Sequence, residues 1–397
     1  MPSRPLDGRR VWFVGIGGAG LSAYAQLARA WGAEIGGWDR VDTAYLEQLR
    51  DVPLEIAPDP VVPNGWEVVV SSAYPEVAGR SRAELLAELV GLRRSIVVAG
   101  THGKGTTAAM IAFVLRETGR DPAWLVGAPV PQLGANAGSG AGWLVVEGDE
   151  SDGTVFRLPA EIAVVTNVEL DHHTEFRSEA ELRARFEAWL ARAPVVVRDA
   201  PAYDGPLALP GRLNRLNAGT ALAALEAAGV ERAAAEPVLG RFTGTGRRFD
   251  VTELGEVTLV DDYGHHPTEV ALTIAAARER FPGRRLRVLF QPHLYSRTRH
   301  LARELGAALA EADDVAVTDV YPAREQPLPG VTGKLVVDAL SDLGRLPAWT
   351  PSVDAGAAWL ALHAEPGDVL LTVGAGDVDR AAALVRAAVA REDGTPA

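Results

Sequence analysis

The sequence contains no cysteine, and only Lys104 and Lys334 among its basic residues are lysine. Without cysteine the chain has no disulfide bond, no thiolate metal site and no cysteine nucleophile. Positive charge is also scarce, because 39 basic residues stand against 52 acidic ones and give a formal net charge of −13. We therefore expect neither a nucleic acid nor an anionic membrane as a partner, since both require a basic surface.

Long apolar runs are absent as well. The longest uncharged stretch, 122–146, holds three prolines and five glycines, so it predicts loops between short strands and not a membrane helix. The first ten residues are polar and lack the apolar segment of a signal peptide. We expect a cytoplasmic protein with no membrane partner.

The order of apolar runs and helical patterns predicts an α/β fold. The 397 residues suffice for two or three domains, and 47% hydrophobic with 23% charged residues is typical of a folded protein. Strand and helix patterns alternate, which favours three α/β domains with mostly parallel sheets at 1–94, 95–242 and 243–397. The expected strands are 11–14, 68–70, 96–99, 143–146, 162–166, 257–260, 286–290, 315–319 and 369–373; the expected helices are 19–31, one ending near 118, 179–191 and 217–228.

A glycine-rich motif follows the first strand. Gly15, Gly17 and Gly20 form G-x-G-x-x-G before a helix, which allows a diphosphate to approach the helix N-terminus closely. Asp39 follows the next strand, where an acid that binds a ribose would lie. The motif fits a dinucleotide, a UDP-sugar or a tight turn without a ligand.

A second glycine-rich loop precedes Lys104. The run 100–107 reads G-T-H-G-K-G-T-T after an apolar strand, which is typical of a loop that binds nucleotide phosphates through backbone N–H groups and a lysine. Because the chain uses arginine almost everywhere else, a lysine here indicates a need for a compact ammonium group. The alternative is a purely structural turn.

Carboxylates and imidazoles follow two later strands. The runs 147–152 (E-G-D-E-S-D) and 167–173 (N-V-E-L-D-H-H) are loops at strand ends. Each alone is more often a solvated loop, but both together after a phosphate loop favour a metal–nucleotide site.

Polar motifs also mark the later part of the chain. Asn214 and Asn217 lie three residues apart at a helix start, where capping of the helix is the alternative explanation for one of them. Arginines, aspartates and histidines then gather at expected strand ends, in 244–250, 261–267 and 291–299. In parallel sheets such positions bind ligands.

In this order the motifs resemble those of the Mur ligases over nearly the whole chain. They read G-I-G-G-A-G, G-T-H-G-K, E-G-D-E-S-D, T-N-V-E-L-D-H, G-R-L-N-R-L-N-A, G-T-G-R-R-F-D, D-D-Y-G-H-H-P-T-E and F-Q-P-H-L-Y-S-R-T. The last four resemble most closely the members that join L-alanine to UDP-N-acetylmuramate.

The resemblance implies a Rossmann-like UDP-binding domain, a central P-loop-like ATPase domain and a C-terminal Rossmann-like domain. It implies ATP-dependent amide formation with Mg²⁺ through an acyl phosphate, in peptidoglycan precursor synthesis. We expect a monomer or a weak dimer.

The resemblance also assigns residues. It implies substrate contacts at Gly15, Gly17, Gly18, Gly20, Ser71, Ser72, His265, His293 and Arg297. It implies ATP contacts at Gly100, Thr101, His102, Gly103, Lys104, Gly105, Thr106, Thr107, Asn214, Asn217, Arg247 and Asp262. It implies Mg²⁺ ligands at Glu147, His172 and Thr106, and catalytic roles for Lys104, Arg247, His266, His293 and Arg297, with His266 or His293 as the proton acceptor.

Some positions depart from the family pattern. Gly105 stands where a Ser or Thr usually ligates Mg²⁺, Leu213 and Leu294 replace a His and an Arg, and 176–211 is short. Three alternatives therefore stay open: the same chemistry with glycine, serine or a tripeptide, a UDP-sugar-binding relic, and a dehydrogenase. The glycine-rich loop at 100–107 disfavours a dehydrogenase.

Overall fold

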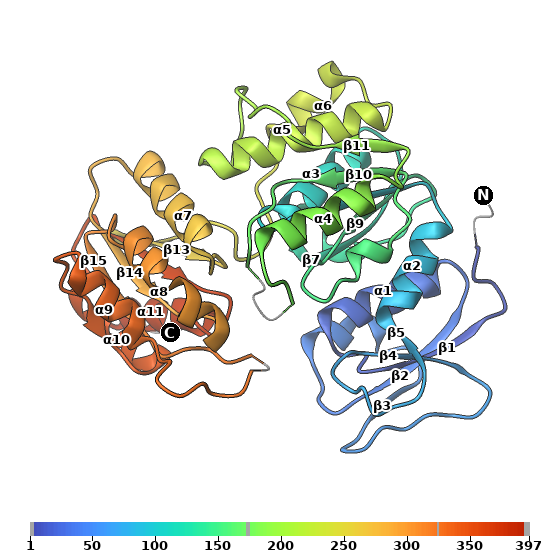
Figure 1. Cartoon of the computed structure of the whole chain (residues 1–397), viewed down its shortest axis with the longest axis horizontal. Coiled ribbons are helices and arrows are strands. Elements are labelled where there is room, and N and C mark those ends of the chain that lie inside the picture. Colours follow the sequence, from blue (N-terminus) through green and yellow to red (C-terminus); the bar gives the residue numbers. More distant parts are fainter. Residues whose placement is uncertain (1–3, 172–174, 324, 393–397) are drawn as a thin grey trace. The chain divides into compact units, whose positions relative to one another are not determined.

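The computed structural model describes residues 4–171, 175–323 and 325–392, which form three β-sheets with helices packed against them (Figure 1). The chain divides into two compact units. The first comprises the residues up to Glu169 with Glu179–Ala208 and Leu216–Thr245, and the second comprises Leu170–Ser178, Leu209–Arg215 and the chain from Gly246 onward. The expected α/β fold is confirmed, whereas the domain boundaries after residues 94 and 242 stay predictions.

The first sheet is entirely parallel, in the order β3-β2-β1-β4-β5. Its central strand β1 is buried after its first residue, as a strand covered on both faces must be. The elements are β1 (Arg10–Val14), α1 (Ala19–Ala30), β2 (Glu34–Asp39), η1 (Ala44–Leu49), β3 (Leu54–Ile56), β4 (Glu67–Val70), β5 (Arg80–Ser81) and α2 (Arg82–Gly91).

The second sheet, also in the first unit, has the order β11-β10-β6-β9-β7-β8, and only the pair β7–β8 is antiparallel. Its elements are β6 (Ser95–Ala99), α3 (Lys104–Glu117), β7 (Ala123–Val130), η2 (Pro131–Leu133), β8 (Ala135–Gly138), β9 (Leu144–Glu147), η3 (Val155–Arg157), β10 (Ile162–Val165), α4 (Glu179–Leu190), β11 (Val195–Val197), α5 (Arg212–Ala227) and α6 (Arg232–Leu239).

The hairpin β7–β8 corrects the expectation of loops with short strands over 122–146, because β7 is eight residues long. Its glycines serve packing as well as turns. A Cβ atom at Gly138 would lie 2.1 Å from the indole ring of Trp124, so glycine allows the two strands to pair across the large ring.

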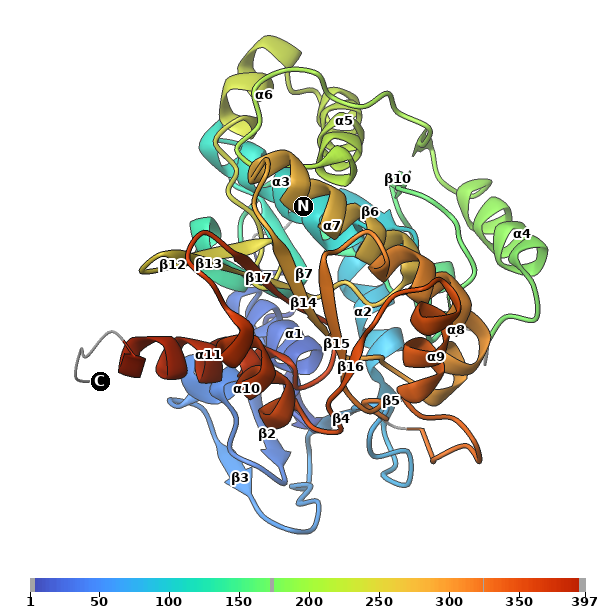
Figure 2. The same ribbon diagram turned by 90° about the vertical axis from the view of Figure 1, so that its left-hand side faces the viewer.

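The third sheet, in the second unit, has the order β12-β13-β17-β14-β15-β16, with only β12–β13 antiparallel (Figure 2). Alternate residues of its strands face two apolar cores: Leu371 packs with α7, α8 and α9, and Leu370 packs with α10 and α11. The elements are β12 (Asp250–Leu254), β13 (Val257–Asp262), α7 (Pro267–Arg280), β14 (Leu286–Phe290), α8 (Tyr295–Leu309), β15 (Asp314–Val317), α9 (Lys334–Asp342), β16 (Ala348–Trp349), α10 (Val353–His363), β17 (Val369–Val373) and α11 (Asp379–Glu392).

None of the helices in the described ranges combines the length and apolar character needed to cross a membrane.

Candidate active site

The glycine-rich loop between β6 and α3 is held by the residues that follow β10. Gly100 has a φ of +124°, and a Cβ atom there would lie 2.3 Å from Thr166 Oγ1. The backbone N–H of Thr101 donates to Asn167 O at 3.1 Å, and that of His102 donates to Asn167 Oδ1 at 2.9 Å. The loop therefore has a defined shape, and the N-terminus of α3 opens into it, where backbone N–H groups favour an anion.

Lys104 is the first residue of α3 and carries its ammonium group beside this loop. The Lys104 Nζ atom lies 3.3 Å from Glu150 Oε2 and 3.3 Å from Thr101 O. The Glu150 side chain is 1% exposed and that of Lys104 is 19% exposed. The buried carboxylate thus holds the cation at the loop.

Glu147 ends strand β9, and its carboxylate lies against the start of α3. The backbone N–H of Gly127 donates to Glu147 Oε2 at 2.6 Å, and a Cβ atom at Gly105 would lie 3.0 Å from the same oxygen. Lys104 and Glu147 therefore flank one helix N-terminus. The expected third contributor to a metal site, His172, lies outside the described residues, while Thr106 is buried in the first turn of α3.

Asn217 lies on α5 against the phosphate loop. Its side chain is buried, and a Cβ atom at Gly103, where φ is +78°, would lie 2.1 Å from its Oδ1. Among the described residues, neither the Asn217 Nδ2 atom nor the buried Thr107 Oγ1 atom has a hydrogen-bond partner. Buried polar groups are rarely left so, and a polar ligand at the loop would satisfy them. Asn214, by contrast, donates to Pro210 O at 2.8 Å at the start of α5.

The first glycine loop, between β1 and α1, is closed by Asp39. Gly15 has a φ of +87°, and a Cβ atom there would lie 2.8 Å from Ser71 Cβ. The Asp39 carboxylate accepts hydrogen bonds from the backbone N–H groups of Gly17 and Arg40, each at 2.7 Å. Because Asp39 serves the turn itself, the geometry gives no support to a ribose contact. The N–H groups of the first turn of α1 remain for an anion.

The expected substrate residues around this loop lie close together. Gly17, Gly18 and Gly20 lead into α1, and Ser71 follows the neighbouring strand β4, with its backbone N–H donating to Val14 O at 2.9 Å. Ser72 is exposed. The loop and the serines thus share the carboxyl edge of the first sheet, where parallel sheets bind ligands.

Arg82, which none of the predicted site motifs includes, lies beside the first turn of α1. Its Nη1 atom is 3.4 Å from the position of a Cβ on Gly20, and its Nη2 donates to Asp152 Oδ2 at 2.5 Å. Burial opposes ionisation of Asp152, but hydrogen bonds from Thr154 and Arg82 outweigh it and lower its pKa. Burial raises the pKa of the neighbouring Tyr24 to about 12. The sequence signal for this position is the capping-box pattern of Ser81 and Glu84, which places Arg82 at the start of a helix.

In the second unit, Arg247 adopts a left-handed backbone with a φ of 56°. Its Nε donates to Asp261 Oδ2 at 2.9 Å, and its Nη2 donates to Gly374 O at 2.9 Å. The guanidinium is therefore held at the carboxyl edge of β13 and β17. Asp261 was not singled out from the sequence, where its neighbour Asp262 was chosen.

Asp262 is buried and internally bonded. Its Oδ2 accepts from the N–H of Phe249 at 2.8 Å, and its Oδ1 accepts from the N–H of Gly264 at 2.8 Å and from Thr273 Oγ1 at 3.0 Å. Burial raises the pKa of Asp262. Since Phe249 has a φ of 53°, the carboxylate stabilises a strained loop, and the geometry gives no support to the expected contact with ATP.

His266 caps helix α7. Its Nδ1 accepts from the N–H of Thr268 at 3.3 Å, while Glu269 Oε2 accepts from the N–H groups of His265 and His266 at 3.2 and 3.5 Å. This arrangement is a capping box, with a histidine in the position usually held by Ser or Thr. His266 is also buried.

The other three expected residues of this unit converge on Asp171. Arg297 Nε donates to Asp171 Oδ1 at 2.5 Å, Arg297 Nη1 lies 3.0 Å from His293 Nδ1, and His265 Nε2 lies 3.7 Å from Asp171 Oδ2. Burial opposes ionisation of Asp171, but the charge of Arg297 and the hydrogen bond from His265 outweigh it, so its pKa lies well below the ordinary value. The structure thus brings His265, His293 and Arg297 together.

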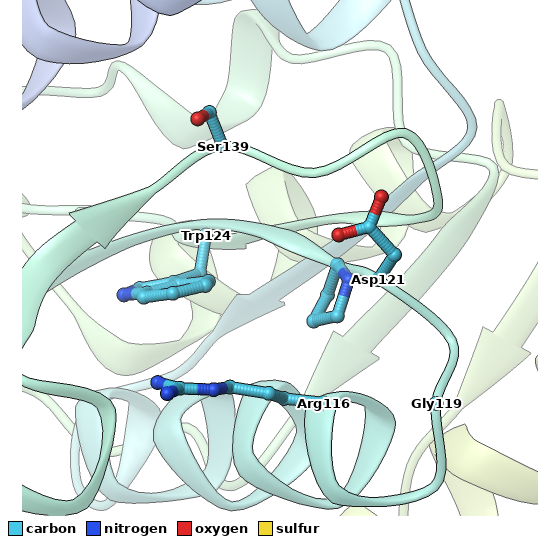
Figure 3. A pocket seen from close by; sticks show the side chains of 6 residues that line it. Arg116, Gly119, Asp121, Trp124 and Ser139 are labelled. Atoms are coloured by element: carbon cyan, nitrogen blue, oxygen red, sulfur yellow. The ribbon is translucent and has the colours of Figure 1, made fainter.

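A pocket of about 390 Å³ lies at the other end of α3, lined by Arg116, Gly119, Asp121, Pro122, Trp124 and Ser139 (Figure 3). Arg116 is twelve residues beyond Lys104, about 18 Å along the helix. Its Nη1 donates to Leu133 O, and Asp121 accepts from the N–H of Ala141. These groups support the β7–β8 hairpin, and the pocket is separate from the phosphate loop.

Residues 247–376 match the family model described as Mur ligase, glutamate ligase domain. The UDP-N-acetylmuramate–L-alanine ligase of Paenarthrobacter aurescens is 39% identical over 93% of this chain and 94% of its own length. That of Streptomyces coelicolor is 36% identical over 95% of this chain and 97% of its own. The crystal structure of the UDP-N-acetylmuramate–alanine ligase of Thermotoga maritima superposes with a TM-score of 0.76 at 25% identity, covering 97% of this chain and 99% of its own.

Proposed function

This chain belongs to the Mur ligase family, and on that premise we propose that it joins L-alanine to the carboxylate of UDP-N-acetylmuramate and converts ATP to ADP and phosphate. The substrates are those in the names of its relatives. The observation that carries the proposal is the arrangement of Lys104, Glu147 and Asn217 around one glycine-rich loop.

The loop and its neighbours would bind ATP. Backbone N–H groups at the start of α3 and the Lys104 ammonium would contact the phosphates. The unpartnered Asn217 Nδ2 and Thr107 Oγ1 atoms are the polar groups that a bound nucleotide would satisfy. These two groups support ATP as the ligand of the loop.

The site also fits Mg²⁺. Glu147 offers a carboxylate at the same helix start. The other expected ligands are Thr106, in the first turn of α3, and His172, which lies outside the described residues. When bound, Mg²⁺ would neutralise negative charge on the β- and γ-phosphates. Gly105 adds no ligand, but it leaves room for the Glu147 carboxylate.

The reaction proceeds in two steps. A carboxylate oxygen of the muramyl group attacks the γ-phosphorus of ATP, the bond to the β-phosphate oxygen breaks, and ADP and an acyl phosphate form. The uncharged amine of alanine then attacks the acyl carbon, phosphate leaves, and the amide nitrogen releases a proton. Catalysis of such phosphoryl transfer consists mostly of positioning and charge stabilisation, for which we propose the cations of Lys104 and Arg247.

The first glycine loop would hold the sugar nucleotide. The N–H groups of the first turn of α1 would contact the diphosphate, and Arg82 would add a guanidinium beside Gly20. Asp39 closes the turn, which disfavours the dehydrogenase alternative. This arrangement needs no nicotinamide.

Phosphate release from ATP tests the function directly. We expect release only when UDP-N-acetylmuramate and L-alanine are both present, with neither substrate sufficient alone. Parallel reactions with glycine, L-serine and a tripeptide determine whether another acceptor is preferred. Absence of release with every one of them, together with retained sugar-nucleotide binding, would support the relic alternative.

A further inference from the structure

Asp171 and Arg297 form a buried ion pair in the second unit, although 126 positions separate them in the sequence. The Nε–Oδ1 distance is 2.5 Å, and the two side chains are only 4% and 2% exposed. A guanidinium bonded through Nε to a fixed carboxylate cannot rotate about its own axis without breaking a charge-assisted hydrogen bond. Asp171 therefore fixes the plane of Arg297.

Arg297 in turn fixes His293. The Nη1 atom of Arg297 lies 3.0 Å from His293 Nδ1 and 3.0 Å from His293 O. Because a guanidinium only donates hydrogen bonds, His293 Nδ1 must be the acceptor, and the proton of the neutral imidazole resides on Nε2. The ring also stacks on Tyr321, with centroids 5.7 Å apart and planes 14° apart.

We propose that Asp171 is a positioning residue, which holds Arg297 and through it His293 so that both present N–H donors to a substrate carboxylate. His293 then donates a hydrogen bond through Nε2–H and is not the proton acceptor. This inference rests on the proposed function, in which two substrates carry carboxylates, the muramyl group and alanine. A carboxylate is the anion that paired N–H donors match best.

Steady-state kinetics of Asp171→Asn test the proposal. The variant keeps the size of the side chain but removes its charge. We expect the KM for the substrate whose carboxylate is bound to rise about tenfold or more, a change of about 1.4 kcal/mol, with a smaller change in kcat. A rise in the KM for L-alanine assigns the amino-acid carboxylate, and a rise in the KM for UDP-N-acetylmuramate assigns the muramyl carboxylate. An unchanged KM for both overturns the proposal.

Two controls separate positioning from other effects of the substitution. Asp171 precedes residue 172, an expected Mg²⁺ ligand. A change in the Mg²⁺ concentration needed for half-maximal rate, without a change in the KM of either carboxylate substrate, therefore overturns the proposal.

Asp368→Asn removes the carboxylate of a matched ion pair: Arg287 Nε donates to Asp368 Oδ2 at 2.5 Å, and both side chains are 6% exposed. Arg287 lies about 10 Å along β14 from the strand end that leads to His293. We expect Asp368→Asn to lower thermal stability but to leave both KM values unchanged, and an equal rise in KM in this variant contradicts the proposal.

The tautomer of His293 provides a readout that needs neither activity nor a folded Asp171 variant. The ¹⁵N shifts of its ring in the full-length wild-type chain, assigned by comparison with His293→Gln, should show Nδ1 unprotonated and Nε2 protonated at neutral pH. A protonated Nδ1 refutes the inference even if the ligase is active. The expected tautomer in a chain that forms no amide would instead refute the proposed function and leave the positioning of His293 intact.

Discussion

Gly103 and Asn217 are packed so closely that a Cβ atom on the glycine would lie 2.1 Å from the amide oxygen of Asn217. The contact joins the phosphate loop to helix α5, which begins more than a hundred residues later in the sequence. It also places the unpartnered Nδ2 atom of Asn217 beside the loop. Gly103 and Asn217 are therefore packed together in the first unit.

Substitution of Gly103 tests this contact. Gly103→Ala should destabilise the chain by roughly 1–3 kcal/mol through its left-handed backbone, and should weaken ATP binding as well because Asn217 must move. Gly119→Ala is the matched control, since Gly119 has a similar φ of +71° near the other end of α3 but open space around it. Denaturant unfolding and ATP titration of both variants measure the difference. Equal ATP affinity in the two variants would contradict a role for the Asn217 contact.

Lys104→Ala should abolish phosphate release while binding of UDP-N-acetylmuramate persists. The reason is that Lys104 serves the loop after β6, whereas the sugar nucleotide is assigned to the loop after β1. Calorimetric titration with the sugar nucleotide and the phosphate assay together measure both properties. Lys334→Ala is the control, because this second lysine is exposed and lies over the ring of Trp349. Loss of sugar-nucleotide binding in Lys104→Ala would show that the two sites were assigned incorrectly.

Gly105→Thr should lower the Mg²⁺ concentration needed for half-maximal rate. The new hydroxyl would lie beside Glu147, whose Oε2 is 3.0 Å from the Cβ position, and the flexible carboxylate can shift by the small distance required. Gly105→Ala adds the Cβ atom without the hydroxyl and controls for crowding. An unchanged Mg²⁺ requirement in Gly105→Thr would mean that the position supplies no limiting ligand.

The ion pair between Arg82 and Asp152 should make stability depend on acid pH. The pKa of Asp152 is lower in the folded chain than its ordinary value of 3.8, so the pair contributes stability above that value and loses it as the pH falls through the folded pKa. Both side chains are partly exposed, so we expect a contribution of about 0.2–1 kcal/mol. Unfolding of wild type and Asp152→Asn between pH 3 and pH 7 measures it. The difference in unfolding free energy between wild type and Asp152→Asn should shrink as the pH falls. A difference that grows at lower pH would contradict a stabilising role for the ion pair.

Apolar patterning predicted the buried parallel strands best. Strands β14 and β17 have the expected bounds, because buried parallel strands are continuous apolar runs with abrupt ends. Strand β15 stops at Val317, two residues early, since Asp319 Oδ1 accepts instead from the N–H groups of Val320 and Gly333. Helix α5 begins at Arg212, before the expected residue 217.

The candidate site was predictable only in part. Glycine loops carry local sequence signals, so the residues around Lys104 could be named in advance. The partners of the site residues arise from contacts distant in sequence, such as Asp171 with Arg297 and Asp261 with Arg247. Asp261 and Asp262 are adjacent, and only their opposite directions on a strand decide which one holds the arginine.

The pairing of Lys104 with a buried glutamate has a practical consequence for chemical labelling. Amine-directed acylating reagents meet only two lysine side chains in this chain, and the one that lies open on the surface is Lys334. An arginine substituted for Lys334 would leave the ammonium at the nucleotide loop as the sole lysine target. A mass-tagged reagent would then report occupancy of that loop by the protection that ATP confers.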